Sequence, residues 1–259
     1  MADEILLEKR KDRVAVLTLN RPQALNAINR AMVAVFRQAI RDVEADPAID
    51  VLVLTGAGER SFCVGVDLKE RQTLDDEEAQ VFRMVELFPM YREFEARQKP
   101  AIALVHGHAL GGGFELALAC DMIIATTQSK FGLPEVKWGL IPAGGGCQKL
   151  PKLIGAARAK EVILAGSGIS AVEAERLGII NRVAPRDSCM DEAIALAGRI
   201  VANVQVAVRG ARRCIDHALD APVASAYDLE VANQCYAAQE RKDGIDAFVS
   251  RKSEKTKNW

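Results

Sequence analysis

Two uninterrupted aliphatic runs, residues 51–56 and 101–105, constrain the fold of this chain more than any other feature. The first run stops at Gly56 and the second begins directly after Pro100, so both are short and sharply bounded. A strand that is apolar at consecutive positions is typical of a parallel sheet with both faces covered. The two runs therefore predict strands buried inside a sheet.

Helical and extended segments alternate along the first part of the chain. Residues 13–19 are rich in β-branched and aliphatic residues and stop at Asn20-Arg21-Pro22, which predicts a strand and a turn. Apolar residues at helical spacing predict helices over residues 29–45 and 75–97, and residues 122–125 predict a further strand. The recurring order of strand, helix and strand predicts an α/β fold built from a repeated unit.

The last third of the chain changes character. After residues 180–183 no strand signal follows, and apolar residues recur at helical spacing through Ala193, Ala197, Ile200 and Val201, and through Val231, Cys235 and Ala238. A boundary near residues 185–188 is expected, which divides the chain into a catalytic core, residues 1–187, and a helical subdomain, residues 188–259. A subdomain of this kind is suited to self-association.

Composition restricts the class of protein and its partners. The 259 residues are 49% hydrophobic and 27% charged, as in a globular domain, and 34 basic against 35 acidic residues give a formal charge of −1. Nucleic acid is therefore not expected as the main partner. The first residues contain no apolar run of the length of a signal peptide or membrane span, which predicts a cytoplasmic location. The six cysteines form no C-x-x-C pair and are expected to be mostly buried, reduced thiols without a metal.

Three consecutive glycines, Gly111 to Gly113, lie between a predicted strand and a predicted helix. Because glycine has no Cβ, a ligand can approach the backbone closely at this point. The first N–H groups of a helix have no internal acceptor and attract negative charge, which suits an oxyanion. The alternative is a tight turn that only packs a strand on a helix. The spacing excludes the G-x-G-x-x-G dinucleotide fingerprint.

Two acidic residues follow glycines in apolar surroundings. Glu115 lies in an almost wholly apolar helix, so we expect its carboxyl to be desolvated and its pKa raised. Glu135 comes directly after Pro134, which is typical of the first helical position. Two carboxyls that reach one pocket can hold a water between them and act as base and acid. The alternative for each is an ordinary acid that favours the helix dipole.

Two further loops have the composition of a pocket mouth. Residues 61–69 combine the end of a strand, Gly65 and polar residues, although on these residues alone a strand-to-loop transition with a solvated Asp67–Lys69 pair is the preferred interpretation. Residues 143–146 are a second glycine-rich loop before a helix, for which close packing is the alternative to ligand contact.

Five segments in this order resemble the crotonase superfamily, specifically its enoyl-CoA hydratase branch, over essentially the whole chain: residues 20–27, 62–69, 109–121, 131–135 and 141–150. The resemblance implies a spiral of repeated ββα units. It also implies a C-terminal helical part that forms homotrimers, which often pair as hexamers. The implied chemistry passes through a thioester enolate and needs no metal or separate cofactor, because coenzyme A is part of the substrate.

The resemblance also assigns residues. The backbone N–H groups of Val66 and Gly112 would hold the thioester oxygen, Glu115 would activate the water that adds to C3, and Glu135 would deliver the proton to C2. The bent coenzyme A would follow two loops, and the implied contacts are Gln23, Ala24, Ala27, Val64, Asp67, Leu68, Lys69, Gly111 and Ala143.

The presence of both acids favours a hydratase, since relatives that only shift a double bond often keep one of them. The alternatives within the family are an isomerase, a specialised hydroxyacyl-CoA dehydratase and a retro-aldol enzyme. A non-catalytic relative that binds acyl-CoA or RNA is a further alternative. The near-neutral charge and the lack of an RNP-like aromatic motif disfavour RNA.

Overall fold

The structure is a computed structural model that describes residues 4–218 and residue 243. Its chain divides into two compact units, residues 1–197 and residues 198–259. The division lies inside helix α8 (Cys189–Val201), and helix α9 (Gln205–Ala218) belongs to the second unit. A functional boundary at 187/188 and a trimerising helical part stay predictions. The helix predicted through Val231, Cys235 and Ala238 lies outside the described residues.

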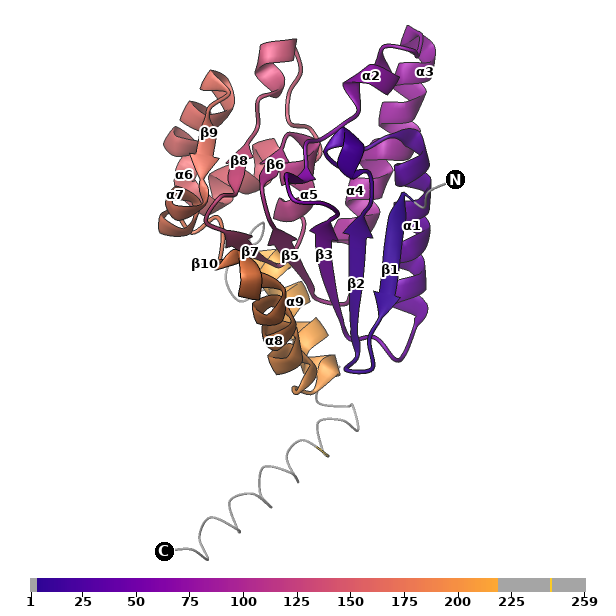
Figure 1. Ribbon diagram of the computed structural model, residues 1–259, viewed down its shortest axis with the longest axis vertical. Coiled ribbons are helices and arrows are strands. Elements are labelled where there is room, and N and C mark those ends of the chain that lie inside the picture. The colour runs from indigo at the N-terminus through magenta and orange to yellow at the C-terminus, as the bar shows by residue number, and fades with distance from the viewer. Residues whose placement is uncertain (1–3, 219–242, 244–259) are drawn as a thin grey trace, which may run out of the picture. The chain divides into compact units, whose positions relative to one another are not determined.

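Two sheets form the first unit. The larger has the order β1-β2-β3-β5-β7-β10 and is parallel except for the β1–β2 pair, as the neighbouring strands in Figure 1 show. The smaller has the order β4-β6-β8-β9 and is parallel except for β8–β9. The strands are β1 (Ile5–Lys9), β2 (Val14–Leu19), β3 (Val51–Gly56), β4 (Ser61–Cys63), β5 (Ala101–Val105), β6 (His108–Leu110), β7 (Met122–Thr126), β8 (Lys130–Gly132), β9 (Gly168–Ser170) and β10 (Arg182–Ala184).

The two sheets are built by repetition. Each of β3, β5 and β7 in the larger sheet is followed along the chain by β4, β6 or β8 in the smaller sheet, and then by a helical segment. The predicted α/β fold of repeated ββα units is confirmed. Every residue of β3 and β5 is buried, as expected for strands covered on both faces. The strands of the smaller sheet have three residues each, too few for periodicity to predict them.

The helices connect and cover these strands. The α-helices of the first unit are α1 (Arg30–Ala45), α2 (Leu68–Arg71), α3 (Asp76–Val81), α4 (Phe88–Glu95), α5 (Gly112–Leu118), α6 (Gly146–Ala165) and α7 (Ala171–Arg176). Short 3₁₀-helices are η1 (Pro22–Ala24), η3 (Glu135–Trp138) and η4 (Arg186–Ser188). Helix α1 is capped by the Asn29 side chain, which accepts a hydrogen bond from the Met32 N–H. Its Phe36 packs edge-on against Phe94 of α4, with ring centroids 5.2 Å apart.

The single helix predicted over residues 75–97 is interrupted. Between α3 and α4 lies a π-helical segment, η2 (Phe82–Leu87). Pro89 in the first turn of α4 has no N–H to donate to the preceding turn, and its ring would clash with a carbonyl there. A wider π turn accommodates this proline without ending the helix.

The cysteines are less buried than predicted. All five described cysteines are free, but only Cys63 and Cys189 are buried. Cys120, Cys147 and Cys214 are partly exposed, because Cys120 follows the end of α5 and Cys147 lies at the start of α6. The expectation of mostly buried thiols is therefore wrong for these three. The sixth, Cys235, lies outside the described residues.

Asn26 holds the turn between β2 and α1. Its buried amide donates to the carbonyl oxygens of Ala57 and Ser61, both at 2.9 Å, and its Oδ1 accepts from the Arg21 N–H at 2.9 Å. Leu25 and Asn26 both have positive φ, 53° and 57°. Left-handed backbone is costly for leucine and tolerated by asparagine. The turn thus keeps its conformation because Asn26 ties it to the β3–β4 loop.

Replacing Asn26 with alanine should lower the free energy of unfolding by about 3 kcal/mol, because three hydrogen bonds are lost and two carbonyl oxygens lose their donor. Urea unfolding of both proteins measures this difference. The exposed Gln128→Ala serves as control and should change the value by less than about 0.5 kcal/mol. Equal effects of the two substitutions would contradict this account of the turn.

Candidate active site

The glycine turn joins β6 to α5 through a conformation that only glycine adopts readily. Gly111, the residue before α5, has φ 52° and ψ −131°. As the first helical residue, Gly112 has an N–H without an intrahelical acceptor. The N–H of Gly112 and that of Val66 both donate to no acceptor in the described part of the chain. These are the two N–H groups predicted to hold an oxyanion.

The backbone of residues 63–65 lies directly against this turn. A methyl group at Gly113 would collide with the Cys63 carbonyl, and one at Gly65 would lie 2.9 Å from the Gly112 nitrogen. Gly65 also has φ 90°, which disfavours a side chain. The glycines are therefore needed for close packing, and the same packing brings Val66 to the start of α5. The packing interpretation and the ligand interpretation of the turn are compatible.

Glu115 is buried in α5, with only 4% of its surface exposed. Its Oε1 accepts a hydrogen bond of 2.9 Å from the Gly146 N–H. The pKa of Glu115 is raised to about 7, chiefly by burial and also by the Glu135 carboxylate, against the lowering effect of the Gly146 and Gly144 N–H groups. The raised pKa expected for this residue is what the structure gives.

Glu135 lies close to the glycine turn at the start of η3. It is half-buried, and burial raises its pKa. Its Oε2 is buried and has no hydrogen-bond partner among the described residues. A methyl group on Gly111 would lie 3.2 Å from the other oxygen, Oε1. The side chain therefore lies over Gly111, within electrostatic range of Glu115. Pro134 precedes η3 as its cap and is not the first helical residue, so the predicted position of the proline is wrong by one residue.

The two loops predicted to bind coenzyme A are held together. Ile28 forms a parallel bridge with Val66: its N–H donates to the Gly65 carbonyl at 2.8 Å, and its carbonyl accepts from the Asp67 N–H at 2.9 Å. Arg21 also pairs with Asp67 at 2.9 Å. Asp67 caps α2 by accepting from the Lys69 and Glu70 N–H groups. Asp67 is thus a structural partner of Arg21, and the alternative of a solvated Asp67–Lys69 pair is wrong.

The remaining predicted contacts differ in accessibility. Gln23, Leu68, Lys69 and Ala143 are exposed, Ala24 and Val64 are partly buried, and Ala27 is buried. The loop that contains Ala143 lies against Glu115: a methyl group on Gly144 would be 2.7 Å from Glu115 Oε2. This loop therefore supplies both an amide donor and close packing to the carboxyl. Contact of any of these residues with coenzyme A stays a prediction.

Tyr91 is a site residue that the sequence did not indicate. It is buried in α4, and its hydroxyl donates to the Gly112 carbonyl at 2.9 Å. Cys147 lies near the two acids, since both carboxylates contribute to the raised pKa of its thiol after burial. Tyr91 is not near any of the predicted site loops in sequence, so no local pattern could have placed it there, whereas Cys147 directly follows the glycine-rich loop of residues 143–146.

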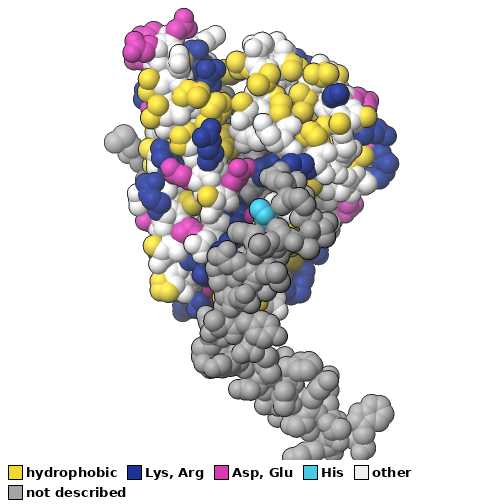
Figure 2. All heavy atoms as spheres, turned by 180° about the vertical axis from the view of Figure 1, so that it is seen from behind, with side chains coloured by type: hydrophobic (Ala, Val, Ile, Leu, Met, Phe, Trp, Pro, Cys, Tyr) yellow, Lys and Arg dark blue, Asp and Glu magenta, His cyan; other side chains and the backbone are white. Residues whose placement is uncertain are grey.

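Exposed apolar side chains belong to two of the segments near these loops. On α2, α3 and η2 they are Leu68, Val81, Met84 and Val85, and on η3 and just after it they are Trp138, Leu140 and Ile141. Helices α2 and α3 lie at the upper end of the molecule in Figure 1, and hydrophobic side chains gather at the upper end of the face in Figure 2. Such a surface suits an apolar ligand.

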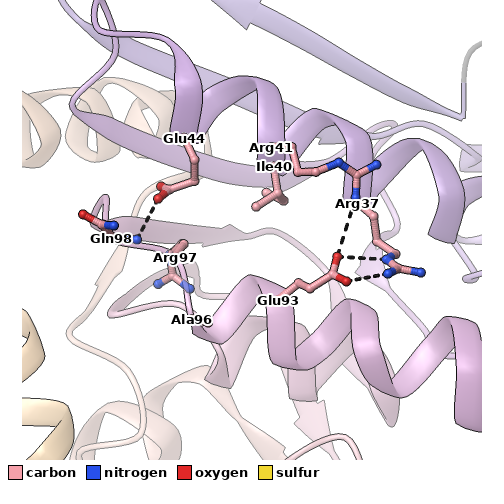
Figure 3. A pocket seen from close by; sticks show the side chains of 8 residues that line it. All are labelled: Arg37, Ile40, Arg41, Glu44, Glu93, Ala96, Arg97 and Gln98. Atoms are coloured by element: carbon pink, nitrogen blue, oxygen red, sulfur yellow. Dashed lines mark hydrogen bonds and ion pairs between the residues drawn. The ribbon is translucent and has the colours of Figure 1, made fainter.

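A groove of about 330 Å³ lies elsewhere, between α1 and α4 (Figure 3). Arg37 on one wall forms a two-pronged ion pair with Glu93 on the other. Glu44 accepts hydrogen bonds from the N–H groups of Gln98 and Lys99. Its polar groups pair with one another, and it contains none of the predicted site residues. The groove is therefore not the candidate site.

Residues 4–218 and 243 contain no group of three or more His, Cys, Asp and Glu side chains that could hold a metal ion. No single helix within them is long and apolar enough to cross a membrane. The bent pair of residues 186–201 and 205–218 meets that test only when both helices are counted together.

Comparison with known proteins gives a consistent result along the chain. A family model described as enoyl-CoA hydratase/isomerase matches residues 9–258. The chain is 37% identical to the crotonyl-CoA hydratase of Syntrophomonas wolfei, covering 97% of each chain. It is 38% identical to the short-chain-enoyl-CoA hydratase of Clostridium acetobutylicum, covering 99% of this chain and 98% of that one.

Solved structures agree on the fold. The structure resembles that of an enoyl-CoA hydratase from Bacillus anthracis with a TM-score of 0.89 at 34% identity, covering 96% of each chain. It resembles the structure of enoyl-CoA hydratase subunit I from Geobacillus kaustophilus with a TM-score of 0.89 at 36% identity, covering 96% of this chain and 95% of that one. The predicted crotonase-like fold is therefore confirmed.

The raised pKa of Glu115 should make stability depend on pH. An unfolded Glu has a pKa near 4.5, whereas Glu115 in the folded protein titrates at about 7. The folded state therefore holds more protons in this window, and stability falls as the pH rises through it. Between pH 5 and 8 the wild type should lose up to about 3 kcal/mol that Glu115→Gln retains.

Urea unfolding at the two pH values measures the loss. Glu77→Gln removes an exposed carboxylate from α3 and should follow the wild type at both. If the Glu115→Gln variant lost as much stability as the wild type between pH 5 and 8, the carboxyl would not be held in the protonated form by the fold.

Proposed function

Because the chain belongs to the enoyl-CoA hydratase/isomerase family, we propose that it is a hydratase that reversibly adds water across the 2,3 double bond of a 2-enoyl-CoA thioester. One observation carries this choice within the family. Two carboxyls with raised pKa values, Glu115 and Glu135, lie within electrostatic range of each other, beside two N–H groups, of Val66 and Gly112, that donate to no acceptor among the described residues.

The N–H groups act on the thioester oxygen. When water attacks C3, the electrons of the double bond move toward the thioester carbonyl and place negative charge on its oxygen. The donors at Val66 and Gly112 are fixed by the backbone contact between Gly65 and the glycine turn, so they need no rearrangement as the charge develops. Such preorganised donors stabilise the enolate more than the neutral ground state.

The carboxyls move the protons. Glu115 takes a proton from the attacking water while the C3–O bond forms, and Glu135 gives a proton to C2 as the enolate collapses. Net addition of one water leaves the pair with one proton, as before. Burial raises the pKa of both carboxyls, and the Glu135 charge adds to the rise at Glu115, so loss of both protons from the pair is disfavoured. The division of roles between the two carboxyls rests on the resemblance.

Coenzyme A and the acyl chain of the substrate would bind next to the two carboxyls. The loops that contain Gln23, Ala24 and Ala27 and residues 64–69 receive coenzyme A, and Gly111 and Ala143 border the reacting end. The exposed apolar side chains of η2 and η3 suit an acyl chain, although they do not identify it. By the resemblance, Val66 stands where a smaller residue is usual, and its branched side chain is expected to narrow the pocket.

Further features of the proposal follow from the family. We expect a homotrimer or a dimer of trimers, a cytoplasmic location, a role in fatty acid metabolism, and no cofactor besides the coenzyme A of the substrate. Membrane and nucleic acid are not expected as partners, and a formal charge of −1 supports the second expectation.

A second reaction on the same site is isomerisation, which transfers a proton between two carbons and adds no water. It needs one acid–base residue, so one of the two carboxyls would be dispensable. Dehydration of a specialised hydroxyacyl-CoA or retro-aldol cleavage would use both. A non-catalytic acyl-CoA- or RNA-binding protein would need neither.

With crotonyl-CoA and a panel of longer and branched enoyl-CoAs, we expect the absorbance of the conjugated thioester to fall as water adds. Glu115→Gln and Glu135→Gln should each lower kcat by about 10²–10⁴-fold, because each removes a proton-transfer group but keeps its size. The exposed Glu77→Gln should turn over like the wild type.

Product analysis separates the alternatives. Hydroxyacyl-CoA as product, lost in both site variants, supports the hydratase. A product with a shifted double bond, together with activity that survives in one of the two glutamine variants, would show that the protein is an isomerase. Unchanged absorbance across the panel, together with tight, salt-sensitive RNA binding, would replace it by the non-catalytic alternative.

A further inference from the structure

Tyr91 is the one described tyrosine, and it lies where the glycine turn, the Gly144 loop and helix α4 meet. Its hydroxyl donates to the Gly112 carbonyl at 2.9 Å. A methyl group on Gly112 would collide with that hydroxyl, and one on Gly144 would lie 3.0 Å from the ring carbon Cε2. The ring thus packs against both glycine segments that surround Glu115.

The hydroxyl remains a neutral donor under all ordinary conditions. Burial, followed by the charges of Glu115, Cys63 and Glu135, raises the pKa of Tyr91 well above its usual value. A neutral phenol has a single proton to donate, and here that proton points to the Gly112 carbonyl. Tyr91 therefore fixes one particular peptide group in the first turn of α5.

Helix α4 brings Tyr91 to this position from a distant part of the sequence. Leu87, Tyr91 and Phe94 are buried and share one face, at spacings of four and three residues. Leu87 is the last residue of the π-helical segment η2, which directly precedes α4. Because a π turn takes in an extra residue, it rotates the helix that follows relative to the one before. The interruption at Pro89 therefore sets which face of α4 meets the glycine turn.

We propose that Tyr91 is a positioning residue of the oxyanion hole: by holding the Gly112 carbonyl, it fixes the first turn of α5 and thereby the direction of the Gly112 N–H. This inference rests on the proposed function, since it gives a role to a group that holds a thioester oxygen. Tyr91 acts through Gly112 and donates no hydrogen bond to the substrate. Glu115, three residues after Gly112 in the same short helix, depends on the same anchor.

The structure offers a matched control for a buried hydroxyl. Thr55 Oγ1 in β3 donates to the Leu104 carbonyl at 3.0 Å, in the interior of the larger sheet. Tyr91→Phe and Thr55→Val each remove one buried hydroxyl that donates to one backbone carbonyl, and each keeps the shape of the side chain. A structural role alone predicts the same consequences for both: a lower melting temperature and unchanged chemistry.

We expect Tyr91→Phe to lower kcat about tenfold with KM changed less than about threefold, short of the 10²–10³-fold loss that follows removal of a direct donor. Thr55→Val should change kcat less than about twofold, since it contacts no group of the site. Thermal unfolding of both variants shows whether their losses of stability are comparable.

A spectroscopic measurement separates positioning from stability. Hydrogen bonds to a carbonyl lower its stretching frequency, so infrared difference spectra of bound butyryl-CoA, labelled with ¹³C at the thioester carbonyl, report on the donors. This saturated thioester cannot be hydrated, so the readout does not depend on turnover. The wild type and Thr55→Val should show the same lowered frequency, and Tyr91→Phe a smaller lowering.

The outcomes are distinct. If Tyr91→Phe has the frequency and kcat of Thr55→Val, while the wild type hydrates enoyl-CoA, the inference about Tyr91 is overturned and the proposed function stands. If the wild type neither lowers the carbonyl frequency nor turns over any enoyl-CoA, the proposed function fails and takes the inference with it. A wild type that lowers the frequency without turnover, together with a smaller lowering in Tyr91→Phe, supports the inference and rejects the hydratase.

Discussion

The contact between the backbone of residues 63–65 and the first turn of α5 is the constraint on which the rest of the site depends. Each partner has glycine at the points of contact, since a methyl group at Gly65, Gly112 or Gly113 would meet neighbouring backbone or the Tyr91 hydroxyl. The contact brings two N–H groups from distant loops to one place. It also fixes the start of the helix that contains Glu115, so electrostatics and geometry have a common origin.

The free energy lost when Glu115 is buried is only partly compensated by hydrogen bonds. A carboxylate in an apolar helix loses its hydration, and here the compensation comes from the N–H groups of Gly144 and Gly146. These donors do not bring the pKa back to its ordinary value. The pKa of Glu115 therefore stays near neutral pH, where the carboxyl can both accept and release a proton. The burial that keeps it there lowers the stability of the protein.

Sequence patterns predicted what depends on neighbours along the chain. The burial of β3 and β5, the apolar face of α1 and the glycine-rich start of α5 are local properties, and the structure has them all. Contacts between distant residues could not be predicted from periodicity. The hydrogen bond from Tyr91 to Gly112 spans 21 residues and the Arg21–Asp67 pair spans 46, and neither has a local signature. Only the resemblance indicated that Glu115 and Glu135 share a site.

The bridge between Ile28 and Val66 connects binding to chemistry. Its two hydrogen bonds lie on either side of Val66: the Ile28 N–H donates to the Gly65 carbonyl, and the Ile28 carbonyl accepts from the Asp67 N–H. Hydrogen bonds of the Asn26 and Arg21 side chains fix the turn of residues 21–27. Under the proposed function, coenzyme A bound along this turn would contact the segment that is bridged to Val66. Binding energy from a part of the substrate far from the double bond would then help to hold the proposed oxyanion donor in place.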